Sequence, residues 1–482
     1  MLRKTKIICT IGPSVRSYEK ILQLIDAGMN VARLNFSHGT SKEHQETIEM
    51  LKKARKEKAV PLAIMLDTKG PEIRLGAIKN HSLEVFSKQK ILITKEEVLG
   101  DANGISIQPS FVLDSLQVGA QILFDDGYIL TKVVEISKKG VLVEIENNGV
   151  IRSYKGVNVP GVHIDLPSMT EQDIKDILFG CRLDVDLIAA SFIRSAEHVL
   201  EIKRLLISQE KPEILVIAKI ENSLGIKNFD AILQVADGIM VARGDLGVEL
   251  PLNQVPRLQK MMIRKSRQAG KPVITATQML ESMITNPLPT RAEVSDVANA
   301  IYDSTSAVML SGETAAGKYP IQVVQMMKEI AEETEKDFNY RQLFANDSAM
   351  GFKDIAITNS VALASVKTAY SSHAKGIFVF TNSGFSARAL SRLRPEIPII
   401  ALTPHSKVYH QLALEWGVTP ALSSAQKNIQ EAFIQISNFA LEQGIVQLGD
   451  LVVVVAGDPF GISRTTNTMI VETIANNCSL ND

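Results

Sequence analysis

Two short apolar segments of the chain end in charged residues, at positions where a buried strand would ordinarily remain apolar. In VIAKIE, Lys219 and Glu221 are two residues apart and therefore project from the same face of a strand. In IMVARGD, Arg243 and Asp245 repeat this spacing, with Gly244 between them. Cations and carboxylates at such places suit a site for a metal ion and an anionic ligand. Structural ion pairs at the two strand ends are the alternative interpretation.

The residue types at these ends indicate what the site could bind. Glu221 and Asp245 offer two hard oxygen ligands, which suit Mg²⁺ when its remaining positions are left to water and a substrate phosphate. Gly244 would let a ligand approach the backbone closely. Positive charge for phosphoryl oxygens could come from three side chains, Arg33, Lys219 and Arg74.

Polar side chains also follow the ends of other apolar segments. One group is an all-oxygen set that would suit a monovalent cation, although hydrogen-bonded packing of the loops explains it equally well. Its members are Asn35, Ser37, Asp67 and Thr68. The remaining polar strand ends are Arg33, Lys69, Thr277 and Glu313. Structural ion pairs would not select the same end of so many strands, so the series favours a functional rim.

These residues fall on a regular alternation of apolar strands and amphipathic helices. Ser17 is expected to cap one helix that Gly28 ends, and Thr170 with Asp173 loosely fits a capping box. The expected strands are 6–12, 30–36, 61–67, 186–192, 215–221, 238–244, 272–279 and 306–311. Eight strand–helix units predict a TIM (β/α)8 barrel, whose catalytic groups lie at the carboxyl ends of the strands.

The alternation is interrupted once and returns in another form near the C-terminus. Residues 70–165 contain short β-like runs separated by Gly, Asn and Asp, which predicts an inserted all-β domain after strand three. From about Asp354 a second alternation predicts a C-terminal α/β domain with a mostly parallel sheet. We therefore expect a catalytic barrel (1–69 and 166–342), an inserted β-barrel-like domain (70–165) and a C-terminal domain (343–482).

The composition is that of an ordinary globular protein. The 482 residues are 45% hydrophobic and 22% charged, and their formal net charge is −1. This balance gives no general attraction to nucleic acid or acidic lipid, and no apolar run is long enough for a transmembrane helix. Cys9, Cys181 and Cys478 match neither a disulfide framework nor a zinc spacing. We expect a cytoplasmic protein without nucleic-acid or membrane partners.

Two further motifs could bind phosphate, but their spacing is less specific. GETAAGK, which ends at Lys318, satisfies most of the Walker A pattern, yet Tyr319 stands where a Mg²⁺-binding Ser or Thr should be. We therefore expect a tight turn there. FTNSGFSAR places Thr381, Ser383 and Ser386 where a helix begins, which suits either a phosphate cradle or a plain N-cap turn.

Seven segments, in order and in spacing, resemble those of the pyruvate kinase family over essentially the whole chain. They are MNVARLNFSHG, LDTKGPEIR, KGVNVPG, AKIEN, VARGDLGVE, ATQMLESM and SGETAAGKYP. The resemblance implies a barrel, a lid-like β domain and a C-terminal regulatory domain, which is the architecture that the periodicity indicates independently. It also implies a homotetrameric glycolytic phosphotransferase that passes the phosphoryl group of phosphoenolpyruvate to ADP.

The resemblance implies roles for individual residues. Lys219 would stabilise the phosphoryl group in flight and the developing enolate, while Glu221 and Asp245 would hold Mg²⁺ or Mn²⁺. Thr277 would lie near the site of enolate protonation. The substrate-binding set would be Arg33, Lys219, Gly244, Asp245 and Thr277. Arg243 receives no ligand role, so we expect it to form a structural ion pair.

The same resemblance implies a site for a monovalent cation, a site for the nucleotide and a site for an effector. K⁺ would be bound by Asn35, Ser37, Asp67 and Thr68. Glu72 matches the potassium-dependent members, because those with Lys at this place replace the ion with their own charge. The nucleotide would be bound by Asn35, His38, Arg74 and Lys155. For His38, a hydrogen bond that orders its own loop is an equally good explanation.

A phosphorylated effector would bind Thr381, Ser383 and Ser386. The neighbouring segment GDPFGISRTTNT contains Arg464 but no Trp, so it does not decide between a sugar bisphosphate, a sugar monophosphate and a nucleotide. Two other functions share parts of the pattern. A Mg²⁺-dependent barrel lyase acting on pyruvate or oxaloacetate would not need Arg74, Lys155 and an inserted lid. A non-catalytic relative would be expected to have lost Lys219 or a metal ligand, and neither is lost here.

Overall fold

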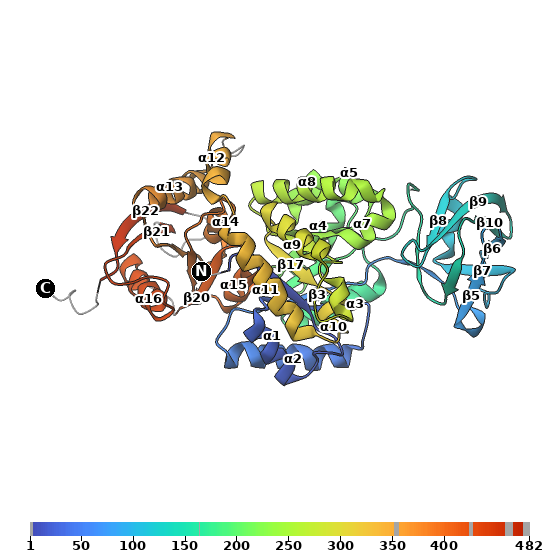
Figure 1. Ribbon diagram of the computed structural model, residues 1–482, viewed down its shortest axis with the longest axis horizontal. Coiled ribbons are helices and arrows are strands. Elements are labelled where there is room, and N and C mark those ends of the chain that lie inside the picture. The colour runs from blue at the N-terminus through green and yellow to red at the C-terminus, as the bar shows by residue number, and fades with distance from the viewer. Residues whose placement is uncertain (1–2, 163, 351–355, 424–427, 458–465, 476–482) are drawn as a thin grey trace.

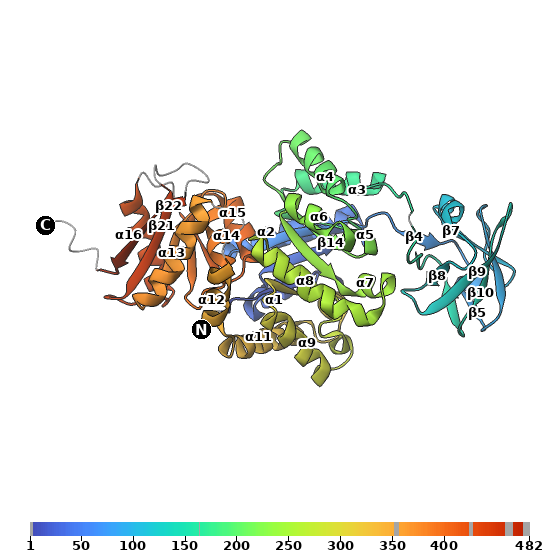
Figure 2. The same ribbon diagram turned by 90° about the horizontal axis from the view of Figure 1, so that it is seen from above.

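The computed structural model describes residues 3–475, apart from residue 163 and residues 351–355, 424–427 and 458–465. These residues form three parts in a row along the long axis of the molecule, with a small β domain at one end, a large barrel in the middle and an α/β domain at the other end (Figures 1 and 2). Within the described part of the chain, no helix combines the length and the apolar character needed to cross a membrane.

The central part is a closed barrel of eight parallel strands. Their order is β1-β17-β16-β15-β14-β13-β3-β2, and β1 closes the barrel by pairing with β17. The strands are β1 (Lys6–Thr10), β2 (Val31–Asn35), β3 (Ala63–Asp67), β13 (Leu187–Ala190), β14 (Leu215–Ile220), β15 (Gly238–Ala242), β16 (Val273–Ala276) and β17 (Ala307–Leu310). The prediction of a TIM barrel with a β domain inserted after strand three is confirmed.

Helices surround the strands and complete the barrel. The main ones are α1 (Tyr18–Ala27), α2 (Ser41–Glu57), α3 (Glu171–Arg182), α4 (Ala196–Ser208), α6 (Phe229–Val235), α8 (Val255–Gln268), α9 (Arg291–Tyr302) and α11 (Pro320–Lys336). The expected caps are confirmed. Ser17 accepts a hydrogen bond from the Lys20 amide, Gly28 ends the same helix at φ +120°, and Thr170 forms a capping box with Asp173.

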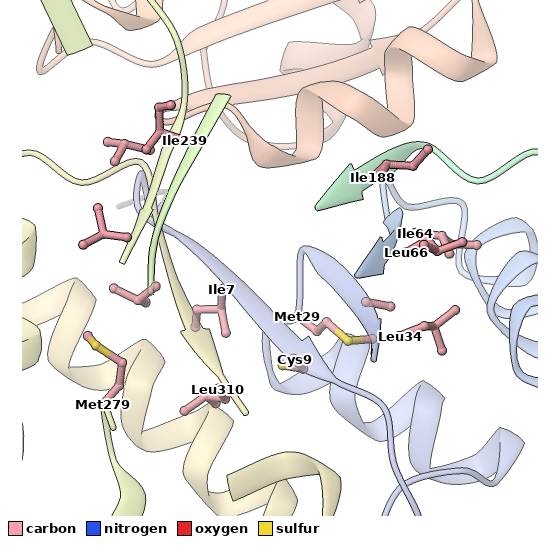
Figure 3. Packing of buried hydrophobic residues seen from close by; sticks show 14 of the residues in the cluster. Ile7, Cys9, Met29, Leu34, Ile64, Leu66, Ile188, Ile239, Met279 and Leu310 are labelled. Carbon is pink, nitrogen blue, oxygen red and sulfur yellow. The ribbon is translucent and has the colours of Figure 1, made fainter. Parts of the chain in front are cut away.

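Side chains of the strands alternate between two apolar layers. On β1, Ile8 lies in the cluster that fills the barrel, whereas Ile7 and Cys9 lie in the cluster between the strands and the helices (Figure 3). Both faces of each strand are therefore covered, which explains the nearly continuous apolar runs in the sequence. Ala413 and Leu414, from the C-terminal domain, join the interior cluster, so this domain packs against the barrel core.

Several of the predicted strands are shorter in the structure, and at one of them a helix takes the place of the predicted strand end. The strand expected at 238–244 ends at Ala242, and a short helix, α7 (Arg243–Glu249), begins immediately after it. Leu246 is buried three residues after Arg243, which is a helical spacing, and Asp245 lies in the first turn, where a carboxylate is favourable. Arg243 and Asp245 therefore do not share a strand face, and their apparent strand alternation has no structural meaning.

The inserted domain is a second, smaller closed barrel with a core of its own. Its strand order is β10-β6-β7-β4-β12-β8-β9, with a separate β5–β11 pair. The strands are β4 (Ile73–Leu75), β5 (Ser82–Val85), β6 (Lys90–Thr94), β7 (Gly104–Gln108), β8 (Gln121–Phe124), β9 (Ile129–Ser137), β10 (Gly140–Ile145), β11 (Gly149–Arg152) and β12 (Gly156–Asn158). Because β4 directly follows β3 and β12 precedes α3, two linkers connect this domain, hereafter the lid, to the barrel.

The C-terminal domain contains a five-stranded sheet in the order β20-β19-β18-β21-β22. Its strands are β18 (Gly376–Phe380), β19 (Ile399–Thr403), β20 (Val418–Leu422), β21 (Leu451–Gly457) and β22 (Thr466–Thr473). Only the pairing of β21 with β22 is antiparallel, so the predicted mostly parallel sheet is confirmed. The accompanying helices are α12 (Tyr340–Met350), α13 (Ile357–Ser371), α14 (Phe385–Ser391), α15 (Ser406–Gln411) and α16 (Ile429–Glu442).

A buried carboxylate ties the amino end of the barrel to the C-terminal domain. Asp186, directly before β13, accepts hydrogen bonds from Arg55 (2.7 Å) and from the Ile64 amide (2.8 Å). The Lys407 ammonium, on α15, lies 3.6 Å from its other oxygen. The Asp186 side chain is almost completely buried, so these partners replace the water that the charge has lost.

We expect Asp186→Ala to destabilise the protein by roughly 3–5 kcal/mol, because it leaves Arg55 buried without its charge partner. Chemical unfolding followed by fluorescence would measure the change. Turnover of the folded variant should be little affected, since Asp186 precedes its strand and lies at the barrel end opposite to the strands' carboxyl ends. Asp26→Ala, which removes a surface pair with Lys58, is the matched control and should cost less than about 1 kcal/mol. Equal effects of the two substitutions would contradict a structural role for the buried carboxylate.

Candidate active site at the carboxyl ends of the barrel strands

A buried lysine is the centre of the polar rim. Lys219, near the end of β14, lies 3.1 Å from Asp67 Oδ1 and 3.0 Å from Glu221 Oε1, and it donates a hydrogen bond to Ser191 Oγ at 2.7 Å. Three different strands deliver these partners, because the carboxyl ends of β3, β13 and β14 are neighbours in the barrel. Burial alone would lower the pKa of Lys219, but the carboxylates of Asp67 and Glu221 outweigh burial and raise it. The ammonium is therefore charged at neutral pH.

Asp67 joins Lys219 to a second cation. Its Oδ2 accepts a 2.6 Å hydrogen bond from Arg33 Nε, and Arg33 Nη1 also donates to Thr10 Oγ1 at 2.9 Å. Burial would raise the pKa of Asp67, yet Arg33 and Lys219 together hold the pKa below its ordinary value. One carboxylate thus fixes two cations at the barrel mouth, and their remaining donors are available to an anionic ligand.

Glu221 and Asp245 form the pair of carboxyl groups that the sequence predicted. Burial raises the pKa of Glu221 to about 7, and burial also raises the pKa of Asp245, which is hydrogen-bonded to Glu221. Glu221 Oε2 accepts a hydrogen bond from the Phe192 amide at 2.5 Å. Two desolvated carboxyl groups in contact are unfavourable when both are ionised, and a cation bound between them would relieve that repulsion.

The donor set fits a divalent cation that shares its coordination with water and substrate. Among the residues that the structure describes, no group of three or more His, Cys, Asp and Glu side chains has the geometry of a metal site. Two carboxylates and otherwise exchangeable ligands are the usual environment of Mg²⁺ in enzymes that bind phosphates. The residues present therefore fit Mg²⁺ better than a metal held entirely by the protein.

Gly244 and Thr277 are brought together at the next two strand ends. The Gly244 amide donates a 2.8 Å hydrogen bond to Thr277 Oγ1, although the two residues are far apart in the sequence. Thr277 has φ +67°, a left-handed conformation that is strained for a β-branched residue. Arg243 stabilises this turn, because it donates to the Thr277 carbonyl at 2.7 Å and forms an ion pair with Asp296 at 2.6 Å. The expected structural role of Arg243 fits this geometry, with Asp296 and not Asp245 as the partner.

The all-oxygen set also gathers in one place. Asn35 and Asp67 are register partners on β2 and β3, and Asn35 Oδ1 accepts a hydrogen bond from the Ser37 amide at 3.1 Å. Thr68 Oγ1 accepts from the Ser191 amide at 3.1 Å. The four residues therefore lie at or directly after two neighbouring strand ends, and hydrogen bonds to Asn35 and Thr68 order the loops that follow.

Other predicted site residues lie away from this cluster and have partners of their own. Arg74 donates to Glu72 at 2.6 Å and to the Tyr154 carbonyl at 2.8 Å, and Lys155 pairs with Asp125 at 2.9 Å, all within the lid. The exposed His38 contributes its backbone carbonyl to a 2.8 Å hydrogen bond with the His44 ring. Glu313 is buried and accepts hydrogen bonds from the Ser311 and Leu280 amides, so it stabilises the turn after β17.

The functional groups directly after β13 were not predicted from the sequence. Ser191 is buried against Lys219, and the Phe192 amide binds Glu221. The only local signal was a serine directly after the apolar strand LIAA, in the position that the other polar strand ends occupy. A cavity of about 130 Å³ lies beside this strand end, between lid residues such as Glu72 and Asp126 and barrel residues such as Phe192 and Asp245.

The predicted effector residues surround the start of α14. Gly384 is the N-cap at φ +79°, the Ser383 carbonyl accepts a hydrogen bond from Arg388 at 2.7 Å, and Ser386 Oγ lies 2.5 Å from Thr466 Oγ1. Thr381 is buried at the end of β18. Arg464 lies outside the described residues.

Fixed positive charge beside paired carboxylates, in a barrel mouth that a lid faces, is the arrangement expected of an enzyme that transfers phosphoryl groups. Comparison with known proteins narrows this class. Residues 2–324 match the family model "Pyruvate kinase, barrel domain", and residues 359–472 match "Pyruvate kinase, alpha/beta domain". The chain belongs to the pyruvate kinase family.

Individual relatives agree with the family models. The chain is 48% identical over 456 residues to the pyruvate kinase of Chlamydia muridarum, covering 94% of each chain. It is 47% identical over 477 residues to that of Geobacillus stearothermophilus, covering 98% of this chain and 81% of the relative. It is 45% identical over 474 residues to that of Clostridium acetobutylicum, covering 98% of this chain and all of the relative. The chain is accordingly a glycolytic phosphotransferase that converts phosphoenolpyruvate and ADP to pyruvate and ATP.

The raised pKa of Glu221 makes the binding of a divalent cation dependent on pH. Below that pKa the cation has to displace a proton from the carboxyl group, and above it the carboxylate is already free. We expect Mg²⁺ affinity to rise by about tenfold between roughly pH 6 and pH 8. Isothermal titration calorimetry in two buffers of different ionisation enthalpy would report both the affinity and the released proton. Glu221→Gln is the control and should bind weakly at both pH values; an affinity of the parent that does not change with pH would contradict the assignment.

Proposed function

We propose that Lys219 is the central catalytic group of the phosphoryl transfer. A terminal phosphate oxygen of ADP attacks the phosphorus of phosphoenolpyruvate, and the bond from phosphorus to the enol oxygen breaks. The electron pair remains on that oxygen as an enolate, which takes a proton at carbon and becomes pyruvate. The Lys219 ammonium stabilises the negative charge on the transferred group and on the enolate oxygen. The observation that carries this proposal is a permanently charged, buried ammonium held by Asp67 and Ser191 in a fixed position.

Glu221 and Asp245 hold Mg²⁺, or Mn²⁺ in its place. When bound, the divalent ion neutralises negative charge on the phosphoryl and enolate oxygens. The protein contributes the two carboxylates and keeps the buried Glu221 oriented through the Phe192 amide. The ordering of these ligands before substrate binds reduces the reorganisation needed during the reaction.

Arg33, Gly244 and Thr277 complete the site for phosphoenolpyruvate. The Arg33 guanidinium is oriented by Asp67 and Thr10, so its free edge can bind phosphate oxygens. The Gly244 amide and the Thr277 hydroxyl already face each other at 2.8 Å. A small anionic group can exchange for this internal hydrogen bond, which places Thr277 beside the carbon that is protonated.

K⁺ binds the oxygen atoms of four residues at the ends of β2 and β3. These are Asn35, Ser37, Asp67 and Thr68. The proposal is supported by the register pairing of Asn35 with Asp67 and by the proximity of Thr68 to the same rim through Ser191. Glu72 remains a carboxylate in this chain, so its place supplies no internal cation that would make the ion unnecessary.

ADP binds between the lid and the barrel, with phosphate contacts from Arg74 and Lys155 and further contacts from Asn35 and His38. Both lid cations form ion pairs that are at least partly exposed, with Glu72 and with Asp125. Such pairs are weak, so a nucleotide phosphate can replace the carboxylate partner at small cost. Lid closure then excludes water and strengthens the electrostatic interactions at the barrel mouth.

The C-terminal domain is proposed to bind a phosphorylated effector at Thr381, Ser383 and Ser386. The placement of these three residues around the left-handed Gly384 at the start of α14 supports this. Residues 1–69 and 166–342, 70–165, and 343–482 are the proposed domain limits. A homotetramer and a cytoplasmic location belong to the same proposal and rest on the resemblance to the family.

Lys219→Met should lower kcat by roughly 10³-fold or more, because it removes the fixed charge that stabilises the transition state. Binding of phosphoenolpyruvate should remain within about an order of magnitude, since Arg33 and the divalent ion are retained. A coupled assay of ADP-dependent pyruvate formation measures turnover, and fluorescence titration measures binding. Lys203→Met, at a lysine that pairs with Asp237 on the outer surface of the barrel, is the control and should retain activity. Turnover near the parent rate in Lys219→Met would remove the assigned role.

Replacing K⁺ with Na⁺ should depress turnover of the parent protein by about tenfold or more, because Na⁺ is smaller than K⁺ and holds its water more strongly. Glu72→Lys should reduce that dependence, since the resemblance to the family implies that members with Lys at this place replace the ion with their own charge. The measurement is the same coupled assay in matched chloride salts. A parent enzyme indifferent to K⁺ would overturn the monovalent site.

A further inference from the structure

Both linkers of the lid meet a single loop of the barrel. This loop, residues 191–195, connects β13 to α4 and is hereafter the β13–α4 loop. The first linker follows β3 and contains Thr68 and Gly70, and the second linker, before α3, contains Ile164 to Ser168. In Figure 2 both linkers run between the barrel and the lid. Contacts that hold the two linkers to the barrel therefore also restrict the positions that the lid can adopt.

Arg194 holds the second linker. Its Nη2 donates hydrogen bonds to the Leu166 carbonyl at 2.5 Å and the Pro167 carbonyl at 2.7 Å, and Nη1 reaches the Ile164 carbonyl at 3.4 Å. Its Nε has no hydrogen-bond partner among the described residues, so these backbone carbonyls are the guanidinium's described hydrogen-bond partners. The backbone of Arg194 is itself fixed, because its carbonyl accepts a 2.8 Å hydrogen bond from Asn228. The Arg194 guanidinium therefore holds the second linker in a fixed position against the barrel.

The first linker rests on the other end of the same loop. Gly70 has φ +74°, and a Cβ at this position would lie 2.7 Å from the Phe192 ring and 2.8 Å from Ser191 Cβ. Thr68 accepts two hydrogen bonds from Ser191, one at its Oγ1 from the Ser191 amide and one at its carbonyl from Ser191 Oγ at 2.6 Å. The contact is therefore close, and a displacement of this linker would have to displace Ser191 or Phe192.

The same two residues position the reacting groups. Ser191 Oγ accepts the 2.7 Å hydrogen bond from Lys219, and the Phe192 amide donates to Glu221. Phe192 has φ +53°, which is uncommon for an aromatic residue and persists only where the surroundings enforce it. The bond to Glu221 on one side and the packing against Gly70 on the other are the contacts that enforce it. Lid linkers, Lys219 and Glu221 therefore share one strained, fully anchored loop.

We propose that the β13–α4 loop sets the position of the lid relative to Lys219 and Glu221, and that Arg194 is the positioning residue that clamps the second linker to it. The inference rests on the proposed roles of Lys219 and Glu221. Movement of the lid acts through the linkers on Ser191 and Phe192, whose hydrogen bonds align the ammonium and the carboxylate. Arg194 does not touch the reacting atoms, and its effect passes through the loop.

The test compares Arg194→Gln and Arg194→Lys with Arg204→Gln. Lysine keeps the charge but cannot reach several carbonyls with one forked group. Arg204 is an exposed arginine on α4, paired with Glu197, and serves as the matched control. Hydrogen exchange by mass spectrometry on the full chain without substrates would follow peptides covering residues 164–168 and 190–194. We expect faster exchange in both peptides of the two Arg194 variants and no change in Arg204→Gln.

Steady-state kinetics of the same variants provide the second measurement. We expect kcat of Arg194→Gln to fall by about tenfold, because small misplacements of catalytic groups have large effects on rate. The KM for phosphoenolpyruvate should change less than about threefold, because its proposed ligands are all on the barrel. Arg194→Lys should lie between the parent and Arg194→Gln, and Arg204→Gln should match the parent. Loss of active protein alone would also lower the apparent kcat at an unchanged KM, so kcat is calculated from the concentration of folded protein, measured by circular dichroism on the same samples.

Two results would overturn the inference. One is faster exchange confined to residues 164–168 with an unchanged kcat, which would make Arg194 an anchor of the linker alone. The other is equal behaviour of the Arg194 variants and Arg204→Gln. If Arg194→Gln does not fold, Phe192→Gly addresses the first linker, since it keeps the amide that binds Glu221 but removes the ring against Gly70. An unchanged kcat and unchanged exchange near Gly70 in that variant would also refute the loop's role. Exchange is measured without turnover, so a failure of the proposed function would appear separately, as retained activity of Lys219→Met.

Discussion

The structure depends on balanced charge in a place that water hardly reaches. Two cations, Arg33 and Lys219, share the single carboxylate of Asp67, and Lys219 also lies beside Glu221. An unpaired charge at such a depth would be several kcal/mol less favourable than in water, so each member of the cluster requires the others. The barrel makes the arrangement possible, because the carboxyl ends of its parallel strands converge and deliver groups from distant parts of the chain.

Positive and negative charges are not evenly distributed within the cluster, and this distribution explains its chemistry. Asp67 satisfies the cations and has a lowered pKa, whereas Glu221 and Asp245 face each other with raised pKa values. One part of the cluster therefore holds fixed positive charge, and the neighbouring part attracts a further cation. In the proposed function, a phosphorylated substrate and a divalent ion together complete both parts. The ground state of the protein is thus arranged for the charge distribution of phosphoryl transfer.

The lid adds cations that are held differently. Arg74 and Lys155 are paired with carboxylates at a partly exposed surface, where the pairing contributes little to stability. Those side chains can exchange a carboxylate for a nucleotide phosphate, while the buried cluster of the barrel stays intact. The β13–α4 loop lies between these two environments. It contacts the second linker through Arg194 and the first linker through Ser191 and Phe192, and Ser191 and Phe192 also bind Lys219 and Glu221.

Local patterns in the sequence determined the barrel, the inserted β domain, the mostly parallel C-terminal sheet and the helix caps at Ser17 and Thr170, because strand alternation and capping act over a few residues. They also placed Lys219, Glu221 and Asp67 at strand ends. Only the tertiary structure decided which charges meet, since the partners lie far apart in the chain: Asp67 with both Arg33 and Lys219, and Arg243 with Asp296. The tertiary structure also decided the contact of Ser191 with Lys219 and the start of α7 at Arg243. Both depend on barrel closure and on packing against neighbouring strands, which leave no local periodicity in the sequence.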